Sequence, residues 1–187
     1  YESQKQALTS GPGLDAARQT DVLLYRNWQY KGGWHNLESW KFSQDLFHKI
    51  CLDFWKIPPQ NIRLIEHDSG KLLQDYLQHY RGSRLILYFV SHQTSRQKIV
   101  LHDGSTLETE QLAGWLNNLQ VPVWLIFDTC YARSLEKHLH NPLVAVYYGA
   151  PEDKHAYDFH PRFQKATLSK YCRESERFAK AVWGMDT

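Results

Sequence analysis

The chain has 187 residues, of which 42% are hydrophobic and 14% aromatic, which is enough to bury one sizeable core and excludes an intrinsically disordered chain. Its 22 Lys and Arg residues against 20 Asp and Glu give a formal net charge of +2 without a basic block, so nucleic acid binding is not indicated. No apolar run approaches the roughly 20 residues that a membrane-spanning helix needs, so no membrane span is expected.

The first 20 residues contain Gly11-Pro12-Gly13 and little apolar periodicity, which predicts an irregular N-terminal arm or linker over residues 1–20. One folded domain is then expected over residues 21–187. The chain begins with Tyr1, which is compatible with a leader, a pro-segment, or further domains or subunits upstream.

The first half of this domain alternates between strand and helix patterns. A short apolar run within residues 21–28 predicts a first strand, and apolar residues at helical spacing over residues 37–55 predict a helix that ends before Pro58-Pro59. A second strand is expected at Ile62–Glu66. A second helix, with Ser69 as its N-cap, follows this strand.

Two unbroken apolar runs, at residues 84–91 and 121–127, are typical of central strands that are covered on both faces. Between them, Asp103-Gly104 within residues 98–107 predicts a small hairpin, and helical spacing over residues 112–119 predicts a third helix. Three more elements are expected after the second run: a short helix at residues 134–140, a strand at 143–148 and a closing helix at 167–182.

Strands that alternate with helices predict an α/β fold. We expect a mostly parallel central sheet, helices on both of its faces, and a small hairpin after the strand that leads to His92. Functional sites of such sheets gather beyond the carboxyl ends of the strands. His92 and Cys130 each follow a central strand, so their side chains meet if the two strands are neighbours.

A thiol with the usual pKa of about 8.5 is mostly protonated at neutral pH, whereas the thiolate is the species that attacks. His92 would favour the thiolate of Cys130 or accept its proton, and would later protonate a leaving amine. Backbone N–H groups of Gln93 and Cys130 are the expected donors to an oxyanion, and Asp128 is expected to organise the loop. The alternative is an ordinary buried thiol beside an unrelated histidine.

No metal site is predicted, because Cys51, Cys130 and Cys172 lie far apart and no cluster of histidines shows the spacing of metal ligands. In an oxidising compartment Cys51 could pair with Cys172.

The segment that leads to His92, together with Asp128-Thr129-Cys130-Tyr131-Ala132 after the second apolar run, resembles the caspase/legumain clan of cysteine peptidases. The similarity is greatest to the legumain branch, which includes the catalytic subunit of the glycosylphosphatidylinositol transamidase. It covers about residues 21–160 and includes three further segments: Asn61–Asp68, Asn141–Val146 and Ala150–Asp153. It implies a caspase-like fold, peptide-bond cleavage through a thioester, a protein or peptide substrate, and no metal or organic cofactor.

The same resemblance suggests residues that bind substrate. His35 matches the histidine of an Asn-x-Arg-His segment that contributes to the specificity pocket of legumain-type enzymes, although Gly32-Gly33-Trp34 stands in place of its first three residues. A surface histidine in a turn is the alternative. The loop over residues 148–158 corresponds to a wall of the substrate groove, with Tyr148 and Asp153 as candidate contacts; a solvated acidic loop is the alternative.

The chain also departs from the clan. Gln93 stands where the family has Gly directly after the catalytic His, and a side chain there could crowd the oxyanion site. Three functions therefore remain open: a cysteine endopeptidase that uses Cys130 and His92, a transamidase of the same mechanism, and a catalytically inactive peptidase-like binding module.

Overall fold

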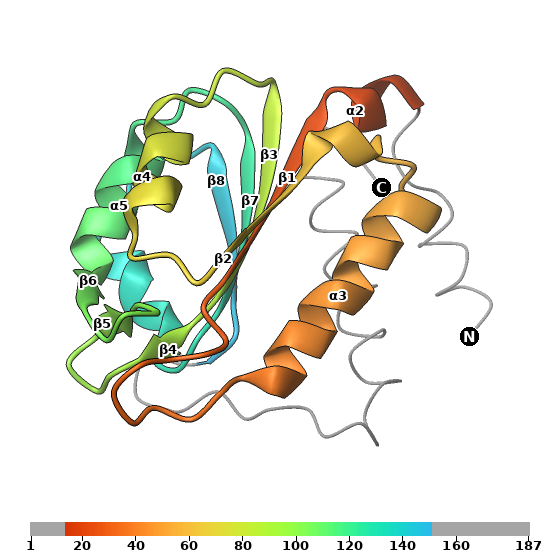
Figure 1. The fold of residues 1–187 in the computed structure, drawn as a ribbon. Helices are drawn as coiled ribbons and strands as arrows, with labels where there is room; N and C mark the ends of the chain where they lie inside the picture. Colours follow the sequence, from red (N-terminus) through yellow and green to blue (C-terminus); the bar gives the residue numbers. More distant parts are fainter. Residues whose placement is uncertain (1–13, 151–187) are drawn as a thin grey trace.

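Five parallel strands form the centre of the computed structural model, which describes residues 14–150 (Figure 1). Their order across the sheet is β2-β1-β3-β7-β8. The strands are β1 (Thr20–Arg26), β2 (Ile62–Glu66), β3 (Arg84–Val90), β7 (Val123–Asp128) and β8 (Val144–Tyr148). All four neighbouring pairs are parallel, which confirms the predicted α/β fold with a parallel central sheet.

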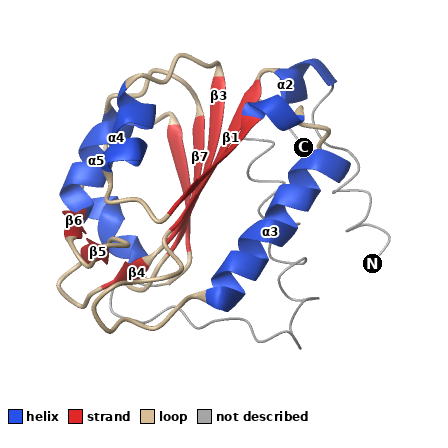
Figure 2. Ribbon diagram, viewed as in Figure 1, coloured by secondary structure: helices blue, strands red, loops and turns tan. Residues whose placement is uncertain are grey.

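Helices cover both faces of this sheet (Figure 2). Helix α3 (Glu38–Asp53) lies on one face, and α4 (Lys71–Gln78) and α5 (Thr109–Asn117) lie on the other. The described residues also form three short helices, α2 (Leu14–Arg18), η1 (Pro59–Asn61) and η2 (Ala132–Lys137). Helix α2 lies within the segment expected to be irregular, and the closing helix expected at residues 167–182 lies outside the described residues.

Burial of β3 on both faces explains its unbroken apolar sequence. Side chains alternate between the two faces of a strand. Residues 85, 87 and 89 therefore pack in the core with α4 and α5, whereas residues 86, 88 and 90 pack in a second core with Phe47 and Ile50 of α3. All six are 0% exposed.

The N-cap residue of α4 is Gly70 and not the predicted Ser69, and the side chain that caps the helix is that of Asp68. Its two carboxylate oxygens accept hydrogen bonds from the backbone N–H groups of Leu72 (3.2 Å) and Leu73 (3.1 Å). These N–H groups have no acceptor within the helix, so the carboxylate satisfies them and complements the positive end of the helix dipole.

A second, antiparallel sheet follows β3. It contains β4 (His92–Gln93), β5 (Lys98–Val100) and β6 (Thr106–Glu108). Asp103-Gly104 lies in the loop between β5 and β6, as predicted; Gly104 has a φ of 88°, and the Asp103 carboxylate accepts the Ser105 N–H at 3.0 Å. The pairing of β4 with β5 was not predicted, because a two-residue strand has no periodicity to detect.

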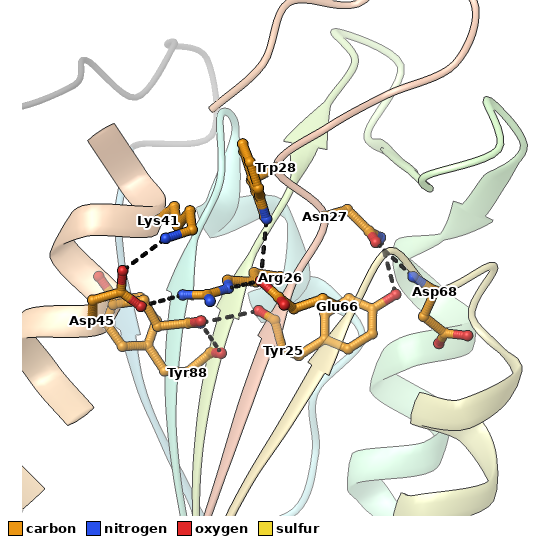
Figure 3. A network of polar contacts seen from close by, with 10 residues as sticks. Tyr25, Arg26, Asn27, Trp28, Lys41, Asp45, Glu66, Asp68 and Tyr88 are labelled. Carbon is orange, nitrogen blue, oxygen red and sulfur yellow. Dashed lines mark hydrogen bonds and ion pairs between the residues drawn. The ribbon is translucent and has the colours of Figure 1, made fainter. Parts of the chain in front are cut away.

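A polar network fastens α3 and β2 to the carboxyl end of β1 (Figure 3). Arg26, which is buried, contacts Asp45 of α3 (2.5 Å) and Glu66 of β2 (2.6 Å). Glu66 also accepts a hydrogen bond from the Trp28 indole at 3.1 Å, and Lys41 lies 5.6 Å from the Trp28 ring. The network therefore fixes where the chain leaves β1.

Across residues 14–150, the structure contains no helix that is long and apolar enough to cross a membrane.

Candidate functional site

His92 and Cys130 line the same cavity, which has a volume of about 630 Å³ and lies beyond the carboxyl ends of the central strands. Strands β3 and β7 are neighbours, and Val90 is paired with Asp128 at their ends. His92 comes two residues after Val90, and Cys130 comes two residues after Asp128. The topology thus brings the two predicted residues to one site.

The His92 ring is held by contacts on several sides. Its Nε2 lies 2.7 Å from the backbone carbonyl oxygen of His35, and its backbone N–H donates to the Tyr30 hydroxyl at 2.9 Å. The rings of Tyr30 and Trp34 have centroids 4.8 Å and 5.1 Å from that of His92. Because a carbonyl oxygen can only accept, Nε2 carries the proton in the neutral ring, and Nδ1 is the basic nitrogen.

Burial lowers the pKa of His92 below its usual value of 6.5. The hydrogen bond to the His35 carbonyl opposes this shift, and the nearby His35 imidazole adds to it. A lowered pKa keeps the ring neutral near pH 7, which is the form that can accept a proton.

His35 belongs to the loop formed by residues 28–37, which we call the 28–37 loop. Hydrogen bonds hold this loop near both of its ends. The Leu37 N–H donates to the Trp28 carbonyl oxygen at 2.7 Å and closes the loop, and His102 Nδ1 donates to the Gln29 carbonyl oxygen at 2.7 Å. Gly32 and Gly33 have φ values of 91° and 93°, which a residue with a side chain rarely adopts. The loop therefore holds the His35 carbonyl oxygen against the His92 ring.

Tyr30 connects this loop to His92. Its hydroxyl donates to the Asn27 carbonyl oxygen and accepts the His92 N–H. Burial raises the pKa of Tyr30 to about 12; its contacts with the Ser91 hydroxyl and the His92 N–H lower the pKa, and the Coulombic influence of Cys130 raises it. The hydroxyl therefore stays protonated near pH 7.

The two cysteines within the described residues differ in exposure. Neither Cys51 nor Cys130 forms a disulfide there. Cys51 is 0% exposed, and burial raises its pKa well above the usual value, which is the setting of an inert structural thiol. Cys130 is half-buried and lines the cavity, just before Tyr131, whose φ of 52° turns the chain into η2. Cys172 lies outside the described residues.

The Gln93 side chain is held by buried partners. Its Nε2 donates to Ser134 Oγ at 2.9 Å and lies 3.2 Å from Thr109 Oγ1, and its Oε1 accepts from Thr129 Oγ1 at 2.8 Å. These bonds direct the amide group toward α5 and η2. Gln93 lines the cavity, and its amide group, which could have crowded an oxyanion site, is held by these three hydroxyl groups.

Asp128 is the one carboxylate among the described residues that line the cavity. It is 7% exposed and accepts a hydrogen bond from the Tyr88 hydroxyl at 3.1 Å. This partner comes from β3, so Asp128 helps to join the two central strands at the edge of the site.

The predicted substrate contacts fall in different places. The exposed His35 lines the cavity. Tyr148 lies at the end of β8, opposite Phe127, packs against the core and is not among the residues that line the cavity. Asp153 lies outside the described residues. The roles of these residues in substrate binding stay predictions.

The cavity also contains residues that the sequence analysis did not single out for it: Trp34, Leu37 and Trp40. They follow β1, whose last residue, Arg26, is paired with Val90 at the end of β3. Since parallel neighbours end at the same edge of a sheet, the chain after β1 could have been expected at this site.

Comparisons with known proteins assign no family. No family model matches the chain, and no curated protein sequence matches it. A similar solved structure, the crystal structure of Chaetomium thermophilum Raptor, has a TM-score of 0.40 and 16% sequence identity over 66% of this chain. The similar region spans 14% of the Raptor chain. A TM-score this low assigns neither a fold family nor an activity.

Proposed function

We propose that the chain is a cysteine peptidase of the caspase/legumain type, in which Cys130 is the nucleophile and His92 the general acid and base. The observation that carries this proposal is the cavity that both residues line, at the ends of adjacent parallel strands. The hydrogen bond from His92 Nε2 to the His35 carbonyl oxygen supports it, because that bond leaves Nδ1 as the basic nitrogen.

In this mechanism, the Cys130 sulfur attacks the carbonyl carbon of a peptide bond while Nδ1 of His92 takes the thiol proton. The carbon–nitrogen bond then breaks, the leaving amine receives the proton from Nδ1, and a thioester to Cys130 remains. Water attacks the thioester and gives a proton to Nδ1. The sulfur leaves, regains its proton, and the acid product is released.

The tetrahedral intermediates need donors for a negatively charged oxygen. We assign this role to the backbone N–H groups of Gln93 and Cys130. N–H groups alternate in direction along a strand, and the Thr94 N–H donates to the Lys98 carbonyl oxygen of β5. The preceding Gln93 N–H is therefore expected to point to the opposite edge of β4, away from β5.

The proposal is tested by incubating the full chain with peptides from a denatured proteome and identifying new peptide termini by mass spectrometry. We expect the parent chain to cut peptides and Cys130→Ala to show none above background. His140→Gln, which changes an exposed histidine outside the cavity, is the matched control and should cut as the parent does. Equal cutting by the parent and by Cys130→Ala would refute the proposal.

Two measurements separate the other functions. An added amine that appears in the product in place of water would show transfer, because the two reactions differ in which molecule attacks the thioester. If Cys130 reacts with iodoacetamide no faster than a free thiol, and His92→Ala leaves that rate unchanged, the chain is a binding module and not an enzyme.

A further inference from the structure

One wall of the cavity consists of three large apolar side chains. Trp34 and Leu37 belong to the 28–37 loop, and Trp40 lies in the first turns of α3. Trp34 is 39% exposed, Trp40 is half-buried and Leu37 is 6% exposed. A tryptophan with this much exposed surface beside a cavity is poorly explained by core packing. We call these three residues the apolar wall.

The apolar wall lies beside the candidate acid and base. The Trp34 ring centroid is 5.1 Å from that of His92. A side chain that packs on Trp34 would therefore belong to a residue next to the peptide bond that His92 and Cys130 act on.

The apolar wall is also fixed in place before any substrate binds. The bond between the Leu37 N–H and the Trp28 carbonyl oxygen closes the loop, and the Lys31 N–H donates to the His102 carbonyl oxygen at 3.0 Å. Binding to a preformed surface costs little conformational entropy.

The charges around the cavity argue against an acidic partner. No Lys or Arg among the described residues lines it, and burial keeps His92 neutral. An acidic substrate side chain would lose its hydration there and would find no cation among the described residues that line the cavity. Asp128 could attract a basic side chain, but it is 7% exposed and already accepts a hydrogen bond from Tyr88. An uncharged, bulky side chain fits this lining best.

We propose that the apolar wall binds an aromatic or large aliphatic side chain of the substrate, namely that of the residue whose carbonyl carbon Cys130 attacks. The chain would thus select peptides that carry such a residue on the acyl side of the cleaved bond. This inference rests on the proposed function, since it assigns specificity to the same site.

The test uses peptidyl chloromethyl ketones that share one backbone and differ in the side chain nearest the reactive group: Phe, Leu, Ala, Arg or Asp. The sulfur displaces chloride from these compounds, so the rate of Cys130 modification, followed by mass spectrometry, reports binding beside the thiol. Iodoacetamide, which has no such side chain, measures the reactivity of the thiol itself. We expect the Phe and Leu compounds to react at least tenfold faster than the Ala, Arg and Asp compounds.

Variants identify the surface that makes this selection. In Trp34→Ala, the ratio of the Phe rate to the Ala rate should fall to threefold or less, and Trp34→Phe should restore most of it. Phe42→Ala is the matched control, because Phe42 is 53% exposed on α3 and does not line the cavity. It should leave the ratio unchanged.

The outcomes distinguish this inference from the proposed function. Equal rates for all five compounds, with fast and His92-dependent modification by iodoacetamide, would overturn the inference and leave the peptidase proposal standing. A preference for the Arg compound would also overturn it and point to Asp128. Slow modification by iodoacetamide that does not depend on His92 would reject both.

Discussion

The setting of His92 determines the pH range in which Cys130 can be activated. Burial lowers the pKa of His92 below 6.5, and the His35 imidazole lowers it further. Tyr30, the other titratable ring in contact with His92, stays protonated because its pKa is raised to about 12. A neutral imidazole therefore persists in mildly acidic solution, where an unperturbed histidine would be protonated.

We expect the rate of Cys130 alkylation by iodoacetamide to hold from pH 8 to pH 6.5 and to fall only at lower pH, with a midpoint below 6.5. The sign follows from the lowered pKa of His92: protons occupy Nδ1 only below that pKa, and the base is then lost. The measurement is the second-order rate between pH 4.5 and pH 8.

His35→Ala is the informative variant, because it keeps the backbone carbonyl that holds Nε2 and removes the imidazole that lowers the pKa of His92. The midpoint should move upward, toward 6.5. A rate that instead rises steadily from pH 7 to pH 9, as for an unassisted thiol with a pKa of about 8.5, would contradict a role for His92.

Gln93 joins four structural elements at the site. It lies on β4, and its amide contacts Thr109 at the start of α5, Thr129 after β7 and Ser134 of η2. All of these partners are buried. Gly at this position, as in the resembling family, could not make these contacts, so the side chain has a structural role here.

Gln93→Ala should lower the free energy of unfolding by about 2–4 kcal/mol, because it leaves more than one buried hydroxyl group without its partner and each such loss costs about 1–3 kcal/mol. Urea denaturation followed by circular dichroism measures this change. Gln111→Ala, at an exposed position of α5, should stay within about 0.5 kcal/mol of the parent. A similar effect of the two substitutions would show that the Gln93 contacts contribute nothing.

The elements differ in how far their sequence predicted them. The apolar run of β3 indicated a strand buried on both faces. Side chains alternate between the two faces of a strand, so a run that is apolar at every position places apolar side chains on both. The cap of α4 was mispredicted, because Ser69 and Asp68 both suit a cap and only the path of the chain decides which one reaches the N–H groups.

The strand patterns also made part of the candidate site predictable. Adjacent parallel strands bring His92 and Cys130 together, and strand patterns were sufficient to expect this. The carbonyl contact from His35 and the apolar wall depend on the course of the 28–37 loop. That course is set by long-range bonds such as the one from His102 to Gln29, which no local pattern encodes.

At the level of the whole molecule, two stacked histidines connect the central sheet to the small antiparallel sheet. His67, which follows β2, and His102, in the loop between β5 and β6, have ring centroids 4.7 Å apart. Burial lowers the pKa of His67, and His102 lowers it further. The Nε2 atom of His67 is buried and has no hydrogen-bond partner among the described residues. A proton there would place positive charge beside the second ring and leave an unsatisfied donor.

We therefore expect the chain to be less stable at pH 5.5 than at pH 7.5. In the unfolded chain His67 binds a proton near pH 6.5, whereas in the folded chain its pKa is lower, so stability is lost as the pH falls through 6.5. His92 acts in the same direction, since its pKa is also lowered. The measurement is the urea midpoint at the two pH values, both of which lie above the range where carboxylates titrate.

His67→Asn should reduce the difference between the two midpoints, because it removes the titrating ring. Asn tolerates the left-handed backbone that His67 adopts, with a φ of 54°, so the substitution avoids added strain. His140→Gln, at an exposed histidine, should keep the full difference. If His67→Asn also keeps the full difference between the two urea midpoints, the loss of stability in acid arises from other groups. The contact between the two stacked histidines would then not be sensitive to pH.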